Sequence, residues 1–274
     1  MTIASPRLNW RDRQYGKING QQLEDVLATF SAHWDEKALY SRTNGSEEVF
    51  RRITKLAAIP SWVNFYQHSL LEMLAMFVSL TGTADAMQQA AASSDPYAAV
   101  ADVVASISDE PPGHPAALPL AMAFIANLEA VARYSRTIND MLAALRDRGD
   151  IEALGQALSI DSAIITLPVC QALLKYGQLT GDPSFAEDLF RAVKGPHKKR
   201  LVYPKLRWAE YLLRDRGVFD VCTQDEIYEL VVVHLKLYGD DREHKDAKKS
   251  LFMLFRKWWK EAGIQNPSFS WSAT

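Results

Sequence analysis

A histidine and a glutamate four residues apart are the residues whose types and spacing come nearest to a catalytic or metal-binding pair in this sequence. His68 and Glu72 lie in an apolar stretch that we expect to be one helix over residues 61–80. Residues four apart share a helix face, so this pair could act as a general acid and base or supply two ligands to one metal ion. The polar edge of a largely buried helix gives the same pattern. We favour that second interpretation and expect no bound metal.

A cluster of cations between residues 194 and 207 has the composition of a phosphate-binding surface. A glycine–proline loop carries most of them, and the chain then enters a helix predicted over residues 204–216. The basic residues are Lys194, His197, Lys198, Lys199, Arg200, Lys205 and Arg207. Such side chains bind phosphates, and the rings of Tyr203 and Trp208 could stack on unpaired bases. Alternatively, the two rings cover the core.

The last predicted helix, over residues 244–262, has an aromatic face and a basic face. A rotation of 100° per residue places its apolar residues on one arc and its cations on the opposite arc. The apolar arc holds Leu251, Phe252, Leu254, Phe255, Trp258, Trp259 and Ala262, and the basic arc holds Lys249, Arg256, Lys257 and Lys260. A basic amphipathic helix can bind nucleic acid, an acidic protein or a membrane surface. A terminal helix that buries its aromatic residues in the core and leaves its lysines in water has the same pattern.

Arg191 and His197 are separated by five residues. This spacing resembles the Rx4-6H motif of HEPN-type all-helical ribonucleases, in which arginine and histidine act together at the scissile phosphate. The resemblance covers this short motif alone. It implies a metal-independent ribonuclease with Arg191 and His197 as catalytic residues, and we keep this activity as an alternative.

No motif of high specificity for an enzyme occurs elsewhere in the sequence. There is no GxGxxG sequence, no Walker loop and no nucleophile elbow, and Cys170 and Cys222 each stand alone rather than at the spacing of paired ligands. We therefore expect no cofactor and favour a protein that is not an enzyme. Unpaired cysteines favour a reducing compartment, and residues 1–17 lack the apolar run of a secretory signal. No stretch has the roughly 20 apolar residues of a membrane span, so we expect a cytoplasmic location.

Charge is distributed unevenly along the chain, although the net charge is only −2. Residues 56–132 contain no Lys or Arg and seven acidic residues, whereas residues 191–260 contain 17 basic and 10 acidic residues. Residues 191–260 therefore carry a net charge of +7, which suggests an anionic partner.

Helix caps recur along the whole chain, and no alternating strand pattern competes with them. Thr223 and Glu226 have the spacing of a capping box, and two LRDRG segments, at residues 145–149 and 213–217, each have the arginines and glycine of a helix end. We predict an all-α fold, a multi-helical globular bundle of roughly ten to twelve helices without a significant sheet. The predicted helices cover residues 20–40, 46–58, 61–80, 83–92, 96–107, 116–135, 137–148, 151–158, 161–179, 183–194, 204–216, 223–238 and 244–262, allowing for one or two that merge or fail to form.

The segment Ser108–Pro115 is the best candidate for a domain boundary, because its three prolines and one glycine cannot continue a helix. We expect an acidic, apolar helical region over residues 1–110 and a helical region with a basic C-terminal third over residues 116–274. One continuous domain with a long internal loop remains an equal alternative.

Together these features favour a cytoplasmic helical interaction protein that contacts nucleic acid or an acidic protein through its basic C-terminal surface. A self-associating scaffold is the first alternative, with the basic region of one copy bound to the acidic region of another. The HEPN-like ribonuclease is the second.

Overall fold

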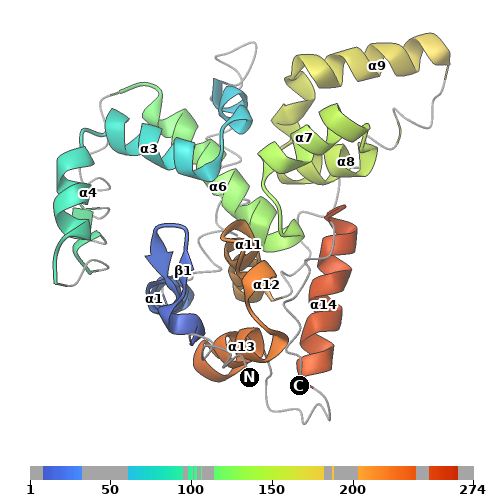
Figure 1. Cartoon of the computed structure of the whole chain (residues 1–274). Coiled ribbons are helices and arrows are strands. Elements are labelled where there is room, and N and C mark those ends of the chain that lie inside the picture. Colours follow the sequence, from blue (N-terminus) through green and yellow to red (C-terminus); the bar gives the residue numbers. More distant parts are fainter. Residues whose placement is uncertain are drawn as a thin grey trace, which may run out of the picture. The chain divides into compact units, whose positions relative to one another are not determined.

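The computed structural model describes residues 9–32, 61–94, 98–100, 102–103, 106, 114–181, 187, 203–238 and 247–264. Helices make up nearly all the regular structure of these residues, and the sheet that they contain has two strands (Figure 1). The predicted all-α class is therefore confirmed.

Contacts within the chain divide it into two units, which are discontinuous in sequence. Unit 1 contains Met1–Asp35, Val131–Ser135 and Leu201–Thr274, and unit 2 contains Glu36–Ala130 and Arg136–Arg200. The predicted boundary at Ser108–Pro115 falls mostly outside the described residues, and the division into residues 1–110 and 116–274 stays a prediction.

The described part of unit 1 begins with a short 3-10 helix, η1 (Trp10–Asp12), and an antiparallel hairpin of β1 (Gln14–Tyr15) and β2 (Ile18–Asn19). Gly16 opens the hairpin turn with a φ of +70°, a backbone conformation that glycine adopts without strain. Helix α1 (Gly20–Ala32) follows directly. A Cβ atom at Gly20 would lie 2.1 Å from the Trp10 carbonyl oxygen, so only glycine fits this close approach.

The C-terminal part of unit 1 consists of α11 (Pro204–Asp215), α12 (Val218–Val221), α13 (Gln224–Tyr228), the π-helical η4 (Glu229–His234) and α14 (Ala247–Glu261). The predicted capping box of Thr223 and Glu226 is confirmed at the start of α13. The single helix predicted over residues 223–238 is wrong in two respects, because the hydrogen bonding changes to the wider π pattern at Glu229 and the helical structure ends at His234.

The core of unit 1 joins the N-terminal segment to these helices. Trp10, Tyr15, Leu23 and Leu27 belong to the same buried cluster as residues of α11 to α14. Other members of the cluster include Leu206, Leu213, Phe219, Ile227, Val231, Leu251, Phe252, Phe255, Trp258 and Trp259. Residues 9–32 are thus part of the core of unit 1.

Unit 2 contains η2 (Ser61–Gln67), α3 (Leu70–Leu80), α4 (Ala84–Ala91), α6 (Ala117–Tyr134), α7 (Ile138–Arg148), α8 (Ile151–Ile160), η3 (Ser162–Thr166) and α9 (Pro168–Thr180). The last four residues of α6 are grouped with unit 1. Helices α7 and α8 pack against each other (Figure 1). Gly149 ends α7 with a φ of +67° and Gly217 follows α11 with a φ of +66°, so the predicted glycine ends of both LRDRG segments are confirmed.

Two buried polar side chains form hydrogen bonds between helices of unit 2. The carboxylate of Asp161 accepts hydrogen bonds from Trp62 Nε1 at 2.8 Å and from the Tyr66 hydroxyl at 2.5 Å. The fully buried Asn127 accepts one from the backbone N–H of Ile138 at 2.8 Å. These bonds connect η2 to the end of α8, and α6 to the start of α7.

Two long predicted helices are each interrupted in the structure. The helix predicted over residues 61–80 is wrong as a single element, because Ser69 and Glu72 form a capping box that starts α3 after η2 has ended. The helix predicted over residues 161–179 is also two elements, because Leu167 adopts the extended conformation that a following proline favours.

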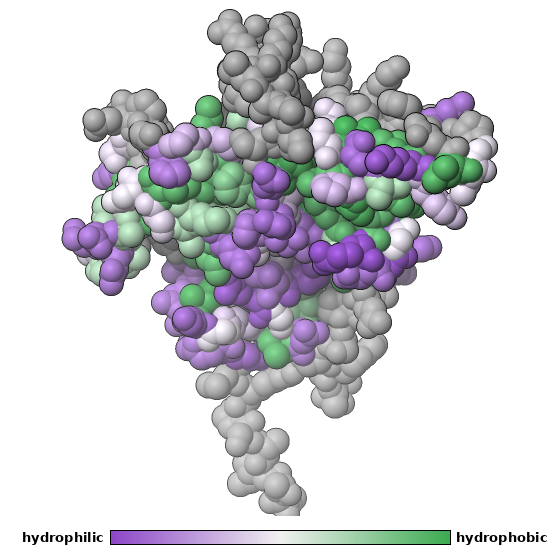
Figure 2. Space-filling model, turned by 90° about the horizontal axis from the view of Figure 1, so that it is seen from above, coloured by the Kyte–Doolittle hydropathy of each residue, from purple (hydrophilic) through white to green (hydrophobic). Residues whose placement is uncertain are grey.

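Part of the hydrophobic surface of unit 2 is exposed to solvent. Leu71, Val169, Tyr176 and Leu179 are among its exposed residues, and Figure 2 shows hydrophobic areas among hydrophilic ones on the face seen from above. In the described part of the chain no single helix is long and apolar enough to cross a membrane. Helices α3 and α4 reach the required length and composition only together, and they are bent by 117° at the break between them.

Candidate functional site

Helix α14 buries its whole aromatic face in the core of unit 1. Phe255 and Trp259 are completely buried, and Phe252 and Trp258 nearly so. The ring of Phe219 on α12 meets Phe255 and Trp259 edge to face, with centroids 5.7 and 5.2 Å apart. The interpretation of these aromatic residues as core residues is therefore confirmed, and their packing fixes the rotation of α14 about its axis.

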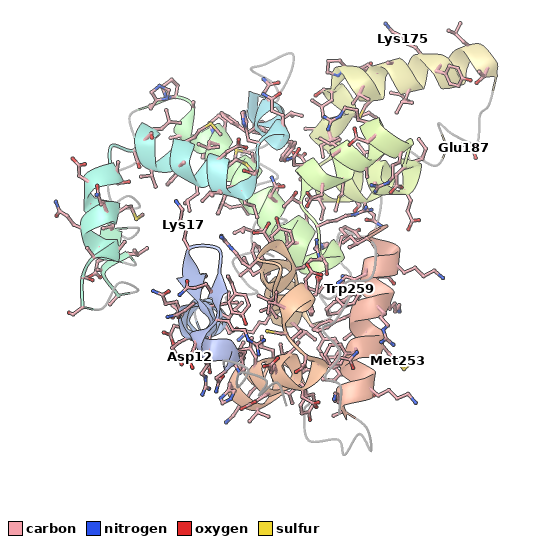
Figure 3. The ribbon with its side chains drawn as sticks, viewed as in Figure 1. Asp12, Lys17, Lys175, Glu187, Met253 and Trp259 are labelled. Carbon is pink, nitrogen blue, oxygen red and sulfur yellow. The ribbon has the colours of Figure 1, made fainter. Side chains whose placement is uncertain are left out.

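The opposite face of α14 carries the predicted cations. Lys249, Arg256, Lys257 and Lys260 are exposed, and we call these four residues the basic stripe. Met253, which is 59% exposed, lies among them, on the side of α14 away from the buried Trp259 (Figure 3). The basic stripe thus follows one side of a helix whose other side is anchored.

The cations of the basic stripe differ in their contacts with the described residues. Lys257 lies 3.8 Å from Glu261, a surface pair of the kind that contributes little to stability. Among the described residues, Arg256 and Lys260 make no ion pair. Both are therefore available to an external anion.

Two cations predicted to bind a partner make internal contacts instead. The guanidinium of Arg207 lies over the ring of Trp258, 4.2 Å from its centroid, and donates a hydrogen bond to the Ser135 hydroxyl. Burial lowers the pKa of Arg207 to about 10, although the negative charges of Glu261 and Glu210 act to raise it. The ammonium of Lys205 donates to the carbonyl oxygen of Ser31 at 2.7 Å.

The aromatic residues that sequence analysis considered for base stacking differ in exposure. Trp208 is buried, with 5% of its surface exposed, so it covers the core as the alternative interpretation expected. Tyr203 is 45% exposed, and its ring lies 5.6 Å from that of Tyr238, centroid to centroid. Tyr203 lies at the start of α11, so its exposed ring is not part of α14.

The loop that carries the other predicted cations lies outside the described residues. This applies to Lys194, His197, Lys198, Lys199 and Arg200, and also to Arg191 of the possible ribonuclease pair. Their roles stay predictions.

His68 and Glu72 lie close together at the start of α3, where Glu72 belongs to the capping box with Ser69. Glu72 accepts the backbone N–H of Ser69 at 2.7 Å, and this bond, followed by one from the Ser69 hydroxyl, lowers the pKa of Glu72. Nδ1 of His68 is 3.9 Å from Glu72. No group of three or more metal-binding side chains occurs in the described segments.

A cluster of charged residues in unit 1 was not expected from the sequence. Arg11 pairs with Glu24 at 2.9 Å and lies 3.1 Å from both ring nitrogens of His234, and His234 also lies 3.2 Å from Glu229. The π-helical turn carries both Glu229 and His234. The residues are distant in sequence, and no local motif marks them. Their contacts attach η1 and α1 to the C-terminal helices.

Comparison of the chain with family models, with curated proteins and with solved structures found no match.

Proposed function

We propose that this protein is a non-enzymatic interaction protein that binds nucleic acid through the basic stripe of α14. The observation that carries this proposal is the exposure of four cations along one side of a helix whose opposite side is fixed in the core. Lys249, Arg256 and Lys260 lie within about 60° of one another around the helix, since each residue turns it by 100°. Such a row can contact several phosphates at once.

The composition of the stripe favours a nucleic acid over an acidic protein. Protein interfaces depend on a few buried anchors, mainly aromatic residues and arginine. Met253 is the exposed large hydrophobic residue of α14, and all the aromatic rings of this helix belong to the core. Interfaces with nucleic acid are more polar and more positively charged, which matches the stripe.

The anchoring of α14 supports tight positioning of the cations. Phe252, Phe255, Trp258 and Trp259 are held in the core, so only the side chains of the stripe lose freedom on binding. A surface that is already ordered loses less conformational entropy in a complex.

The proposal is tested by titrating the full chain into a labelled mixed-sequence nucleic acid at low salt and following fluorescence anisotropy. The double variant Arg256→Gln/Lys260→Gln should bind more weakly, and the slope of log K against log salt should become shallower by about 1.4–1.8, two contacts at about 0.7 each on a single strand or about 0.9 each on a duplex. Lys175→Gln is the matched control, because it removes one exposed lysine from α9 in unit 2. No binding by the unmodified protein would overturn the proposal. Salt-sensitive self-association in sedimentation without nucleic-acid binding would favour the scaffold instead.

A further inference from the structure

Resting on this proposed function, we infer that the basic stripe binds the phosphate backbone of a double-stranded nucleic acid and does not bind unpaired bases.

The stripe offers no aromatic ring to a base. Proteins that bind single strands combine a basic groove with exposed rings, and each stacked base contributes about 1–3 kcal/mol. The four aromatic residues of α14 are 0–3% exposed and are held in the core by one another and by Phe219. Rotating them outward would empty the centre of unit 1. A single strand would therefore gain only its phosphate contacts here.

The geometry of the stripe matches a stiff and densely charged ligand. From Lys249 to Lys260 the helix rises about 17 Å, at 1.5 Å per residue. A duplex carries one phosphate charge per about 1.7 Å of its axis, so about ten phosphates lie along this length. Cations carried by one anchored helix can reach successive phosphates of a stiff duplex, whereas a single strand must be straightened to follow the helix.

Charge is the main recognition feature of this surface. Lys257 lies near Glu261, and among the described residues Arg256 and Lys260 make no ion pair. If the contacts are limited to phosphates, the binding affinity should fall steeply as the salt concentration rises and should depend little on the nucleic-acid sequence.

The test compares a mixed-sequence 20-base-pair duplex with each of its two strands, using the full chain and anisotropy over a range of salt. Slopes of about 0.9 per contact for a duplex and about 0.7 for a strand give, for four contacts and equal affinities at 1 M salt, about sixfold tighter duplex binding at 0.1 M salt. Arg256→Gln/Lys260→Gln should weaken duplex binding, whereas Tyr203→Ala and Lys175→Gln should leave it unchanged. Tyr203→Ala tests an exposed ring, among the described residues of unit 1, that could stack on a base.

Each other outcome identifies which proposal fails. Binding to neither form would overturn the proposed function itself. Equal or tighter binding of the single strands, weakened by Tyr203→Ala, would overturn this inference and leave nucleic-acid binding standing. If the double variant binds the duplex as tightly as the unmodified protein does, α14 is not the binding site and both proposals are overturned. Polyglutamate can also be added as a competitor of the labelled duplex. If it competes as strongly, per charge, as unlabelled duplex does, an acidic protein is the favoured partner and the inference is overturned.

Discussion

The buried carboxylate of Glu210 on α11 accepts a hydrogen bond from Nε1 of Trp259 on α14 at 2.6 Å. The same oxygen accepts a second bond from Arg214 Nε at 2.8 Å. A buried polar contact of this kind has a defined direction that hydrophobic packing lacks. It therefore helps to determine which side of α14 faces the core and which side presents the basic stripe.

Glu210→Ala should lower the free energy of unfolding by about 3–5 kcal/mol, because it removes the acceptor from two buried or half-buried donors. Asp215→Ala on the same helix is the control, since Asp215 is exposed and, among the described residues, forms an ion pair only with Arg216. That control should cost less than about 1 kcal/mol in urea unfolding. Equal losses in the two variants would show that the bond to Trp259 has no special role.

Phe255→Ala should destabilise the protein by about 3–5 kcal/mol, the usual cost of emptying a buried phenyl site. Met253→Ala, two residues away on the exposed side, should change stability by no more than about 0.5 kcal/mol. Thermal melts of the two variants make the comparison. An unchanged midpoint for Phe255→Ala would mean that the aromatic face of α14 is free for a partner.

Asp161→Ala should destabilise unit 2, because the Trp62 and Tyr66 side chains and the backbone N–H of Ala163 lose a charged acceptor. Hydrogen bonds to a charged group contribute about 1.5–3 kcal/mol each, so we expect a loss of at least about 3 kcal/mol. Asp147→Ala serves as the control, because Asp147 is exposed and pairs with Arg146. Similar unfolding curves for both variants would contradict the role of Asp161.

The ion pair of Arg13 and Glu226 should make stability depend on acid pH. Burial alone would raise the pKa of Glu226, but the hydrogen bonds from Thr223 and Arg13 outweigh it and lower the pKa below 4.5. The carboxylate therefore stabilises the fold above about pH 4.5, and this contribution is lost as the pH falls through the lowered pKa. Urea unfolding from pH 7 to pH 3 should show Glu226→Gln approaching the unmodified protein at the acid end. A constant difference across this range would refute the linkage.

Both cysteines should resist thiol reagents in the folded protein. Burial raises the pKa of Cys170 to about 11 and also raises that of Cys222, so the reactive thiolates are scarce at pH 8. Because the raised pKa favours the neutral thiol in the fold, stability should fall above about pH 9, where the unfolded chain ionises first. Mass spectrometry after brief alkylation should find unlabelled protein, with full labelling in denaturant. Rapid labelling of the native state would show that these sites open.

The sequence allowed most helices to be predicted, because their ends depend on local signals. The Thr223–Glu226 cap and the glycines at 149 and 217 act over a few residues, and all three behave as expected. The break before α3 had a similar local signal, Ser69 followed three residues later by Glu72, which the apolar pattern concealed. Pro168 was the corresponding signal for the break before α9.

The contacts of the candidate site depend on residues far apart in sequence, which limits prediction. The amphipathic pattern placed Arg256 and Lys260 on the exposed side of α14 correctly. It gave no sign that Arg207 would lie over Trp258, about 50 residues later, or that Arg11 would lie beside His234. Such contacts follow from how the helices pack, and no spacing rule along the chain describes them.

The joining of residues 9–32 to residues 203–264 in one core has a consequence for synthesis on the ribosome. Trp10, Tyr15, Leu23 and Leu27 are made about 170 residues before the helices that cover them. At about 5–20 residues per second, the nascent segment waits roughly 10–30 s with its apolar side chains uncovered. During that interval it is a candidate substrate for chaperones, and slowing translation between the two segments should increase aggregation of the newborn chain.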